Sequence, residues 1–152
     1  MALRNILTQE SATLRKTSKP VTVFNESLWT LLDDMKETMH KYDGCGIAAP
    51  QVGVLKRVII VEVNNIYIEM VDPEIIAQKG EQCNVEGCLS VKGVAGYVNR
   101  PKTVTVKGFD RFGNEYKVTG TDYFASALCH EIDHLDGILF IDKMVKPYEQ
   151  KK

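Results

Sequence analysis

Apolar side chains recur at intervals of three and four residues between positions 25 and 43, with charged residues between them. This spacing places apolar groups along one face of an α-helix, so it predicts an amphipathic helix that packs against a core. Asn25 can accept a hydrogen bond at the start of this helix, and Gly44 is suited to the left-handed position after its end. The predicted apolar face consists of Leu28, Leu31, Leu32, Met35 and Met39.

Beyond this helix the pattern changes to runs rich in β-branched residues. The runs KRVIIVEV (56–63) and IYIEMVDPEII (66–76) are separated by Asn64 and Asn65, which predicts two strands joined by a tight turn. Residues 102–120 alternate apolar and polar positions around DRFGN, which predicts a second hairpin. The centre of the chain is therefore expected to form mostly antiparallel strands.

Helical spacing returns in residues 121–137, where Thr121 or Asp122 is the expected N-cap and Gly137 the expected end. With the preceding strands, this segment predicts an α+β fold in which mostly antiparallel strands pack around a late helix. The apolar positions of that helix are Phe124, Ala127, Leu128 and Leu135.

Length and composition favour one folded unit. The chain has 152 residues, of which 44% are hydrophobic, enough to bury one substantial core and too few to suggest several. We therefore expect a single domain over residues 1–152. Its lysine-bearing end, from about residue 146 to 152, is expected to be a solvated tail.

Charge and hydropathy exclude several classes of partner. Nineteen basic and twenty acidic residues give a formal charge of −1, so no attraction to nucleic acid or to an anionic membrane is expected. The first residues lack the apolar core of a signal peptide, and no run is long enough to span a bilayer. These features predict a cytoplasmic protein whose four cysteines are reduced thiols or metal ligands.

The late helix carries the pattern H-E-x-x-H, with His130, Glu131 and His134. Residues four apart share one helix face, so both imidazoles can bind one metal ion while Glu131 flanks the same site. The alternative is a chance match on a solvated helix. Leu128 and Leu135 indicate that this helix is buried, where unpaired histidines and a carboxylate are costly, and this favours a metal.

A catalytic metal needs a third protein ligand and an open position. Two common patterns of metalloproteases place the third ligand downstream, one as a histidine and the other as a glutamate. Neither fits, because Phe140 occupies the position of the histidine and Glu149 lies in the expected tail. The third ligand is therefore expected upstream. Apart from ordinary carboxylates, the candidates are His40, Cys45, Cys83, Cys88 and Cys129.

Two of these cysteines lie in informative contexts. Cys129 precedes His130 and points about 100° away from it on a helix, which suits a core thiol better than a ligand. Cys88 lies in EGCLSVKG, a glycine-punctuated segment after a polar loop, where the backbone can approach a bound group. The spacing by itself leaves the choice open.

Three separated segments, GCGIAAPQVGV (44–54), EGCLSV (86–91) and HEIDHLDGILF (130–140), together resemble the signature motifs of peptide deformylases, in the same order. The similarity extends over nearly the whole chain. It implies an enzyme that removes the formyl group from the N-terminal formylmethionine of nascent polypeptides and releases formate. Such peptides are the implied partners, which it could meet at the ribosome, with no direct nucleic-acid specificity and no membrane.

The resemblance also implies the metal site. The family's ligands fall on Cys88, His130 and His134, and its catalytic carboxylate falls on Glu131. One divalent metal per chain is implied, Fe²⁺ ahead of Zn²⁺, Ni²⁺ or Co²⁺, which residue spacing does not separate. In this mechanism the nucleophile is a metal-bound hydroxide, and Glu131 acts as general base and then as general acid.

Further roles follow from the first two motifs. Gln51 and the backbone N–H of Leu89 are implied donors to the formyl oxygen as it becomes negatively charged. Gly44, Cys45 and Gly46 are the implied substrate-binding residues, with the backbone near Gly46 pairing with an extended peptide. The candidates for the methionine pocket, by position relative to the motifs, are Cys45, Tyr123, Ser126 and Ala127.

The charged residues around the motif give two further hypotheses. Asp133 and Asp136 are candidates to accept a hydrogen bond from the second ring nitrogen of a ligating histidine. Arg100 is hypothesised to pair with Glu86 or Asp133 and so to brace the site. Departures from the usual family pattern leave every implied ligand in place and occur at Cys45, Lys92, Ala95 and Cys129.

Two rival functions remain open. A small metallopeptidase would cleave internal peptide bonds and would be indifferent to Cys88→Ala. A non-catalytic module that binds metal or nascent chains would keep the fold without turnover. The presence of Glu131 and Gln51 speaks against this second alternative.

Overall fold

The computed structural model describes residues 2–149, which form three α-helices, two short 3₁₀ turns and eight strands. The helices are α1 (Glu26–Lys41), α2 (Asp122–Leu135) and α3 (Phe140–Lys143), and the turns are η1 (Ala12–Arg15) and η2 (Ala49–Val52). The strands are β1 (Gly46–Ala48), β2 (Val58–Val63), β3 (Ile66–Lys79), β4 (Gln82–Cys88), β5 (Val91–Arg100), β6 (Thr103–Phe109), β7 (Glu115–Thr121) and β8 (Met144–Pro147). None of the described helices has the length and apolarity to cross a membrane.

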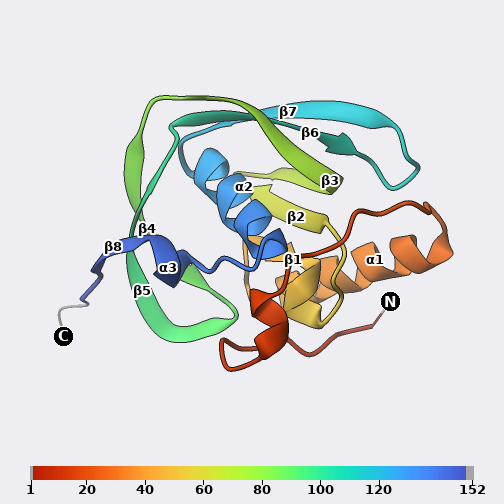
Figure 1. Ribbon diagram of the computed structural model, residues 1–152, viewed down its shortest axis with the longest axis horizontal. Helices are drawn as coiled ribbons and strands as arrows, with labels where there is room; N and C mark the ends of the chain where they lie inside the picture. The colour runs from red at the N-terminus through yellow and green to blue at the C-terminus, as the bar shows by residue number, and fades with distance from the viewer. Residues whose placement is uncertain (1, 150–152) are drawn as a thin grey trace.

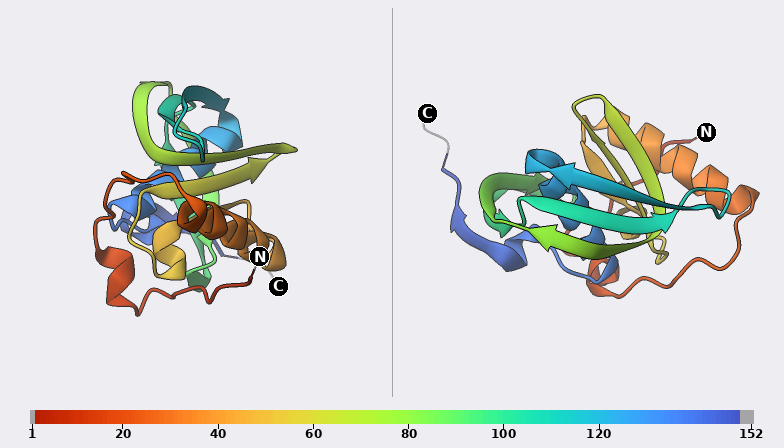
Figure 2. Two further views of the ribbon diagram at one scale, coloured as in Figure 1. Left: turned by 90° about the vertical axis from the view of Figure 1, so that its right-hand side faces the viewer. Right: turned by 90° about the horizontal axis from the view of Figure 1, so that it is seen from above.

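The strands form two sheets in which every pairing is antiparallel. The larger sheet has the order β1-β2-β3-β6-β7, and the smaller has the order β4-β5-β8. Both sheets surround α2, while α1 lies on the outside near β1 and β2 (Figures 1 and 2). The predicted α+β class with mostly antiparallel strands around the late helix is therefore confirmed.

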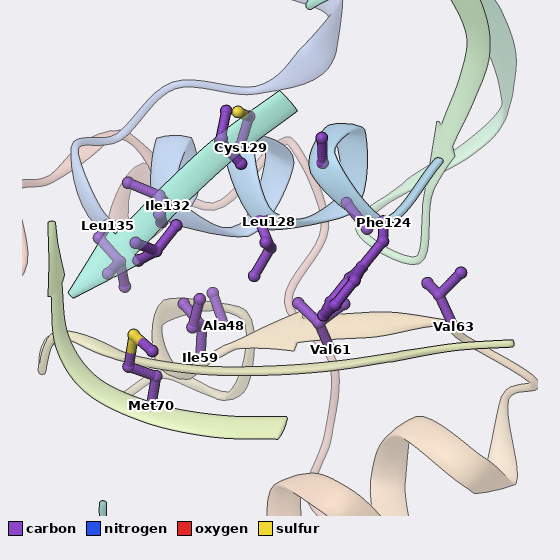
Figure 3. Packing of buried hydrophobic residues seen from close by; sticks show 14 residues of the cluster. Ala48, Ile59, Val61, Val63, Met70, Phe124, Leu128, Cys129, Ile132 and Leu135 are labelled. Carbon is purple, nitrogen blue, oxygen red and sulfur yellow. The ribbon is translucent and has the colours of Figure 1, made fainter. Parts of the chain in front are cut away.

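Strand β2 is buried on both faces and separates two parts of the core. Ile59 and Val61 face α2, where they pack in one cluster with Leu128 (Figure 3). Val58 and Ile60, at the alternate positions, pack in a second cluster with α1. The apolar face predicted for α1 is buried there, including both of its methionines.

The ends of α1 follow the prediction in part. The Asn25 side chain accepts a hydrogen bond from the Leu28 N–H at 3.3 Å, as expected of an N-cap. At the other end Asp43, with φ 55°, takes the left-handed position that was predicted for Gly44. Aspartate also tolerates this conformation, so the left-handed residue lies one position earlier than predicted. The N–H of Gly44 then donates to the Met39 carbonyl.

The turns around the larger sheet and α2 agree with the sequence. Asn64 and Asn65 both have positive φ, as the tight turn between β2 and β3 requires. Gly137 ends α2 with φ 74°, and a side chain there would overlap the backbone of Arg15. Thr121 is the N-cap of α2 by position, although its side chain makes no capping hydrogen bond.

The smaller sheet was not predicted. The segment interpreted as a polar loop and a glycine-punctuated stretch forms β4 and β5, whose alternation is interrupted by glycines such as Gly96. Position 96 is suited to glycine because the Met144 side chain packs where a Cβ would lie. Strand β8 pairs with β5 through Lys146 and Pro147, and the side chains of both residues are exposed to solvent. The last three residues of the expected tail lie outside the described range.

Candidate metal and catalytic site

The end of β4 meets the buried face of α2 at a cluster of metal-binding side chains. One donor atom from each of Cys88, His130 and His134 lies within 4.8 Å of the others, and Cys88 Sγ is 3.3 Å from His134 Nε2. The bulge between Glu86 and Cys88 in β4 accompanies this approach. Of the upstream candidates, the structure brings Cys88 to the motif.

The other candidate ligands lie elsewhere. His40 is on the surface, where its Nε2 is 2.7 Å from Glu62. Cys83 is exposed on β4, and Cys45 lies half-buried on the wall of a nearby cavity. Cys129 is buried in the core, as predicted, and burial raises the pKa of its thiol to about 11. Its side chain projects from another side of α2 than that of Leu128 (Figure 3).

The ring of His130 is oriented by a buried carboxylate. His130 Nδ1 lies 2.8 Å from Glu86 Oε1. Burial alone raises the pKa of Glu86, but hydrogen bonds from Arg100 and His130 outweigh it and hold this pKa at about 2. An ionised carboxylate only accepts hydrogen bonds, so Nδ1 carries the hydrogen and Nε2 is left to face the cluster.

Arg100 connects this carboxylate to α2. Its guanidinium donates two hydrogen bonds to Glu86, at 2.8 and 2.9 Å, and a third to Asp133 at 2.6 Å. The hypothesis that Arg100 pairs with Glu86 or Asp133 is confirmed, because it pairs with both. The hypothesis that Asp133 or Asp136 accepts a hydrogen bond from a histidine ring nitrogen is wrong for His130. Glu86 takes that role, and Asp136 pairs with Arg57.

The electrostatics of the cluster suit a cation. Burial opposes the charged form of His130, but Glu131, Cys88 and Glu86 outweigh it and hold the pKa of His130 well above its usual value. Burial, His130 and Arg100 keep the pKa of His134 well below its usual value, so its ring is neutral. The negative groups that favour a proton on His130 would equally favour a cation in its place, so one thiol and two imidazoles fit a bound divalent metal.

Glu131 is buried beside this cluster with an unused oxygen. Its Oε2 is 4.0 Å from His130 Nε2, and its Oε1 has no hydrogen-bond partner within the described part of the chain. Burial raises the pKa of Glu131 to about 7. Gly46 in β1 packs against this carboxylate so closely that a Cβ would overlap Oε2. A buried carboxylate with a pKa near neutrality is suited to proton transfer.

Gln51 is held in one orientation by contacts at both ends of its side-chain amide. Its Oε1 accepts from the Ala48 N–H at 2.9 Å, and its Nε2 donates to Ser90 Oγ at 3.1 Å and reaches Cys88 Sγ at 3.6 Å. Both Gln51 and Ser90 are buried. The contribution of Ser90 was missed in the sequence, although its place two residues after Cys88 was a usable signal.

A cavity of about 360 Å³ joins these groups. Leu89 lies on its wall, as do the four residues proposed for the methionine pocket. His134 is buried behind the lining, whereas Lys92 and Ala95 lie on β5 away from it. The structure thus gathers the predicted residues on one cavity, namely Gly44, Cys45, Gly46, Gln51, Cys88, Leu89, His130 and Glu131.

We predict that Arg100→Ala lowers both stability and metal affinity. Arg100 and Glu86 are almost fully buried, and removing one partner of such a pair typically costs about 3–5 kcal/mol of unfolding free energy. Loss of an outer hydrogen-bond partner typically weakens metal binding about 10- to 100-fold. Urea unfolding measures the loss of stability, and metal titration of the refolded variant measures the loss of metal affinity.

Arg111→Ala is the matched control. Arg111 also pairs with two carboxylates, Glu69 at 2.6 Å and Asp33 at 3.0 Å, but on the far end of the β6–β7 hairpin from the cluster. This variant is expected to lower stability and to leave metal affinity unchanged. Equal metal affinity in the Arg100 variant and the wild type would show that Arg100 does not brace the site.

Comparisons with known proteins agree on one family. A family model described as polypeptide deformylase matches residues 3–150. Curated peptide deformylases from Caldicellulosiruptor bescii and Alkaliphilus metalliredigens are 54% and 53% identical, each over 96% of this chain and over 88% and 99% of their own lengths.

Solved structures show the same likeness. A peptide deformylase from Legionella pneumophila superposes with a TM-score of 0.90 at 45% identity, over 93% of this chain and 86% of that one. One from Thermotoga maritima gives a TM-score of 0.91 at 36% identity, over 93% of this chain and 97% of that one.

Proposed function

Because the chain belongs to the polypeptide deformylase family, we propose that it hydrolyses the formyl group from N-terminal formylmethionine, with one divalent metal held by Cys88, His130 and His134. The observation that carries this proposal is the meeting of one thiol, two imidazoles and a buried carboxylate on one cavity. Three protein donors leave a coordination position open, as hydrolytic metal sites require.

The donor set suits several metals. A bound divalent cation would supply the positive charge that acidifies water and polarises the formyl carbonyl. Thiolate and imidazole ligands accommodate Fe²⁺, Zn²⁺, Ni²⁺ and Co²⁺, and we propose Fe²⁺ as the metal in the cell. The Glu86 contact then fixes which nitrogen of His130 faces the metal.

Glu131 moves the proton in this proposal. Its unpartnered Oε1 and its pKa near 7 allow it to accept a proton from the attacking water. Positive charge beside Glu131 favours its ionised form, so the carboxylate is ready as a base at neutral pH. The same oxygen then delivers the proton to the departing amine nitrogen, which leaves as the new N-terminus.

Gln51 and Leu89 stabilise the charge that develops on the formyl oxygen. Ala48 and Ser90 hold the Gln51 amide so that its NH₂ group is directed toward the Cys88 side of the cavity. The backbone N–H of Leu89 is the proposed second donor. Such fixed donors cost no reorganisation during the reaction, and each is typically worth about 10²- to 10³-fold in rate.

The substrate is proposed to bind along β1. This strand is the end of its sheet, with β2 on one side, so an extended peptide can add to its other edge. Gly44, Cys45 and Gly46 are the proposed substrate-binding residues at the start of this strand. The Cys45 carbonyl already accepts from the Glu62 N–H, and Gly46 places the strand directly beside Glu131. Backbone pairing gives little selectivity for later residues, so nascent chains of many sequences are the proposed partners, met near the ribosome.

We predict that anaerobically purified protein releases formate from a formyl-Met-Ala-Ser peptide and contains about one divalent metal per chain. Formate detection, metal analysis and mass spectrometry of the product measure this directly. Cleavage of an internal peptide bond would indicate a metallopeptidase instead. A folded, metal-loaded and reduced protein that releases no formate would be a binding module.

A further inference from the structure

The part of the cavity wall proposed for the methionine pocket carries hydrogen-bonding side chains beside aliphatic ones. Among the described lining residues, Leu89 and Ala127 are the two with aliphatic side chains. Cys45, Tyr123 and Ser126 provide a thiol and two hydroxyls at the positions assigned to the methionine pocket. A thioether is a weak acceptor, so a pocket for methionine alone gains little from such groups.

Ser126 has a hydrogen to donate. It is 1% exposed on α2, and its Oγ accepts a hydrogen bond from Asn84 Nδ2 at 3.4 Å. Asn84 Nδ2 also donates to Gln82 at 2.8 Å, which fixes the amide as a donor toward Ser126. Within residues 2–149 no acceptor receives the Ser126 hydroxyl hydrogen, and Ser126 borders the cavity.

Tyr123 and Cys45 supply a second donor. Tyr123 Oη lies 3.5 Å from Cys45 Sγ, so one of the two groups donates to the other and one hydrogen of the pair remains. Burial raises the pKa of Tyr123, so its hydroxyl stays protonated at neutral pH. The two charged oxygens of Glu86 on the same cavity are already occupied by Arg100 and His130. Ser126 and the Cys45–Tyr123 pair therefore keep hydrogens to donate, whereas the unpaired acceptor among the described residues of this cavity, Glu131 Oε1, belongs to the side chain beside His130.

We propose that this pocket binds methionine sulfoxide as well as methionine, so that the enzyme also deformylates peptides beginning with N-formylmethionine sulfoxide. The proposal rests on the deformylase function proposed above. The sulfoxide keeps the length of methionine and adds one strongly accepting, chiral oxygen. Ser126 and the Cys45–Tyr123 pair offer that oxygen the donors that an aliphatic pocket lacks.

The expected selectivity follows from desolvation. A hydrophobic pocket typically rejects a substrate that adds one hydroxyl by about 10²-fold, because the added polar group is left unpaired. With donors present, we expect the kcat/KM of the sulfoxide peptide to lie within about tenfold of that of the methionine peptide. The donors have fixed positions, so one sulfoxide epimer is expected to be the better substrate.

The test compares formyl-Met-Ala-Ser with the two separated epimers of its sulfoxide, using anaerobically purified metal-loaded enzyme. Ser126→Ala and Tyr123→Phe are each expected to lower kcat/KM for the better epimer about tenfold more than for the methionine peptide, since each removes one donor. Calorimetry with the deformylated products Met-Ala-Ser and its sulfoxide measures binding in the pocket apart from turnover. The two variants are expected to weaken binding of the sulfoxide product more than binding of Met-Ala-Ser.

Tyr148→Phe is the matched control, because Tyr148 is 41% exposed, similar to Tyr123 at 44%, but lies outside the cavity lining. It should leave the ratio of the two substrates unchanged. A wild-type preference for methionine of about 10²-fold or more, or a ratio that neither pocket variant changes, would overturn the proposal. Release of formate from neither peptide would instead overturn the deformylase function on which it rests.

Discussion

Replacing Glu131 with glutamine is expected to lower kcat for formate release by about 10²- to 10⁴-fold while the metal content stays near that of the wild type. Glutamine keeps the size of the side chain but neither accepts nor delivers a proton. The buried position beside Gly46 holds the replacement in place, so the loss is in chemistry rather than in substrate position. KM is therefore expected to change little.

Glu115→Gln provides the comparison for removal of a carboxylate. Glu115 is exposed on β7 and its ion pair with Lys107 is loose at 3.8 Å, so this variant should retain full activity and metal. Stopped-flow or steady-state formate assays on the two variants, with metal analysis of each preparation, make the measurement. A Glu131→Gln enzyme with near-normal kcat would require another group to carry the proton.

Local patterns predicted the elements that bury a regular face. The three- and four-residue spacing of α1 and the asparagine pair between β2 and β3 depend on short-range physics, and both were confirmed. The β4–β5 hairpin was missed because its glycines interrupt the alternation, and the reason for Gly96 is contact with Met144, 48 positions away. A residue chosen by such a distant contact leaves no local signal.

The candidate site shows the same division. Spacing on one helix identified His130, Glu131 and His134 as a unit, since four residues complete one turn of a helix. The choice of Cys88 among the thiols came from the family resemblance, and its approach to His134 depends on how β4 crosses α2. The partner of the His130 ring was misassigned because nearest neighbours in sequence suggested Asp133, whereas the fold supplies Glu86 from another element.

Substituting Cys88 with alanine is expected to remove the metal and, with it, formate release. Two imidazoles alone make a weaker site. Loss of a residue that only hydrogen-bonds a ligand typically lowers metal affinity about 10- to 100-fold, so loss of the Cys88 ligand itself should lower it further. The wild type should gain about 2.7 kcal/mol of stability at a free metal concentration 100 times the Kd, which raises Tm by about 5–10 °C. The Cys88→Ala variant should show almost none of this increase.

Cys83→Ala separates the ligand role from a general effect of losing a thiol. Cys83 lies on the same strand but is exposed, so its variant should keep the metal-dependent rise in Tm and the activity. Thermal scans with and without added Zn²⁺ or Ni²⁺ avoid oxidation of iron and give a measurement independent of turnover. A Cys88→Ala protein that still gained the full metal-dependent stability would assign the third ligand to another residue. If it also cleaved internal peptide bonds, the metallopeptidase alternative would be favoured, because that alternative makes no use of Cys88.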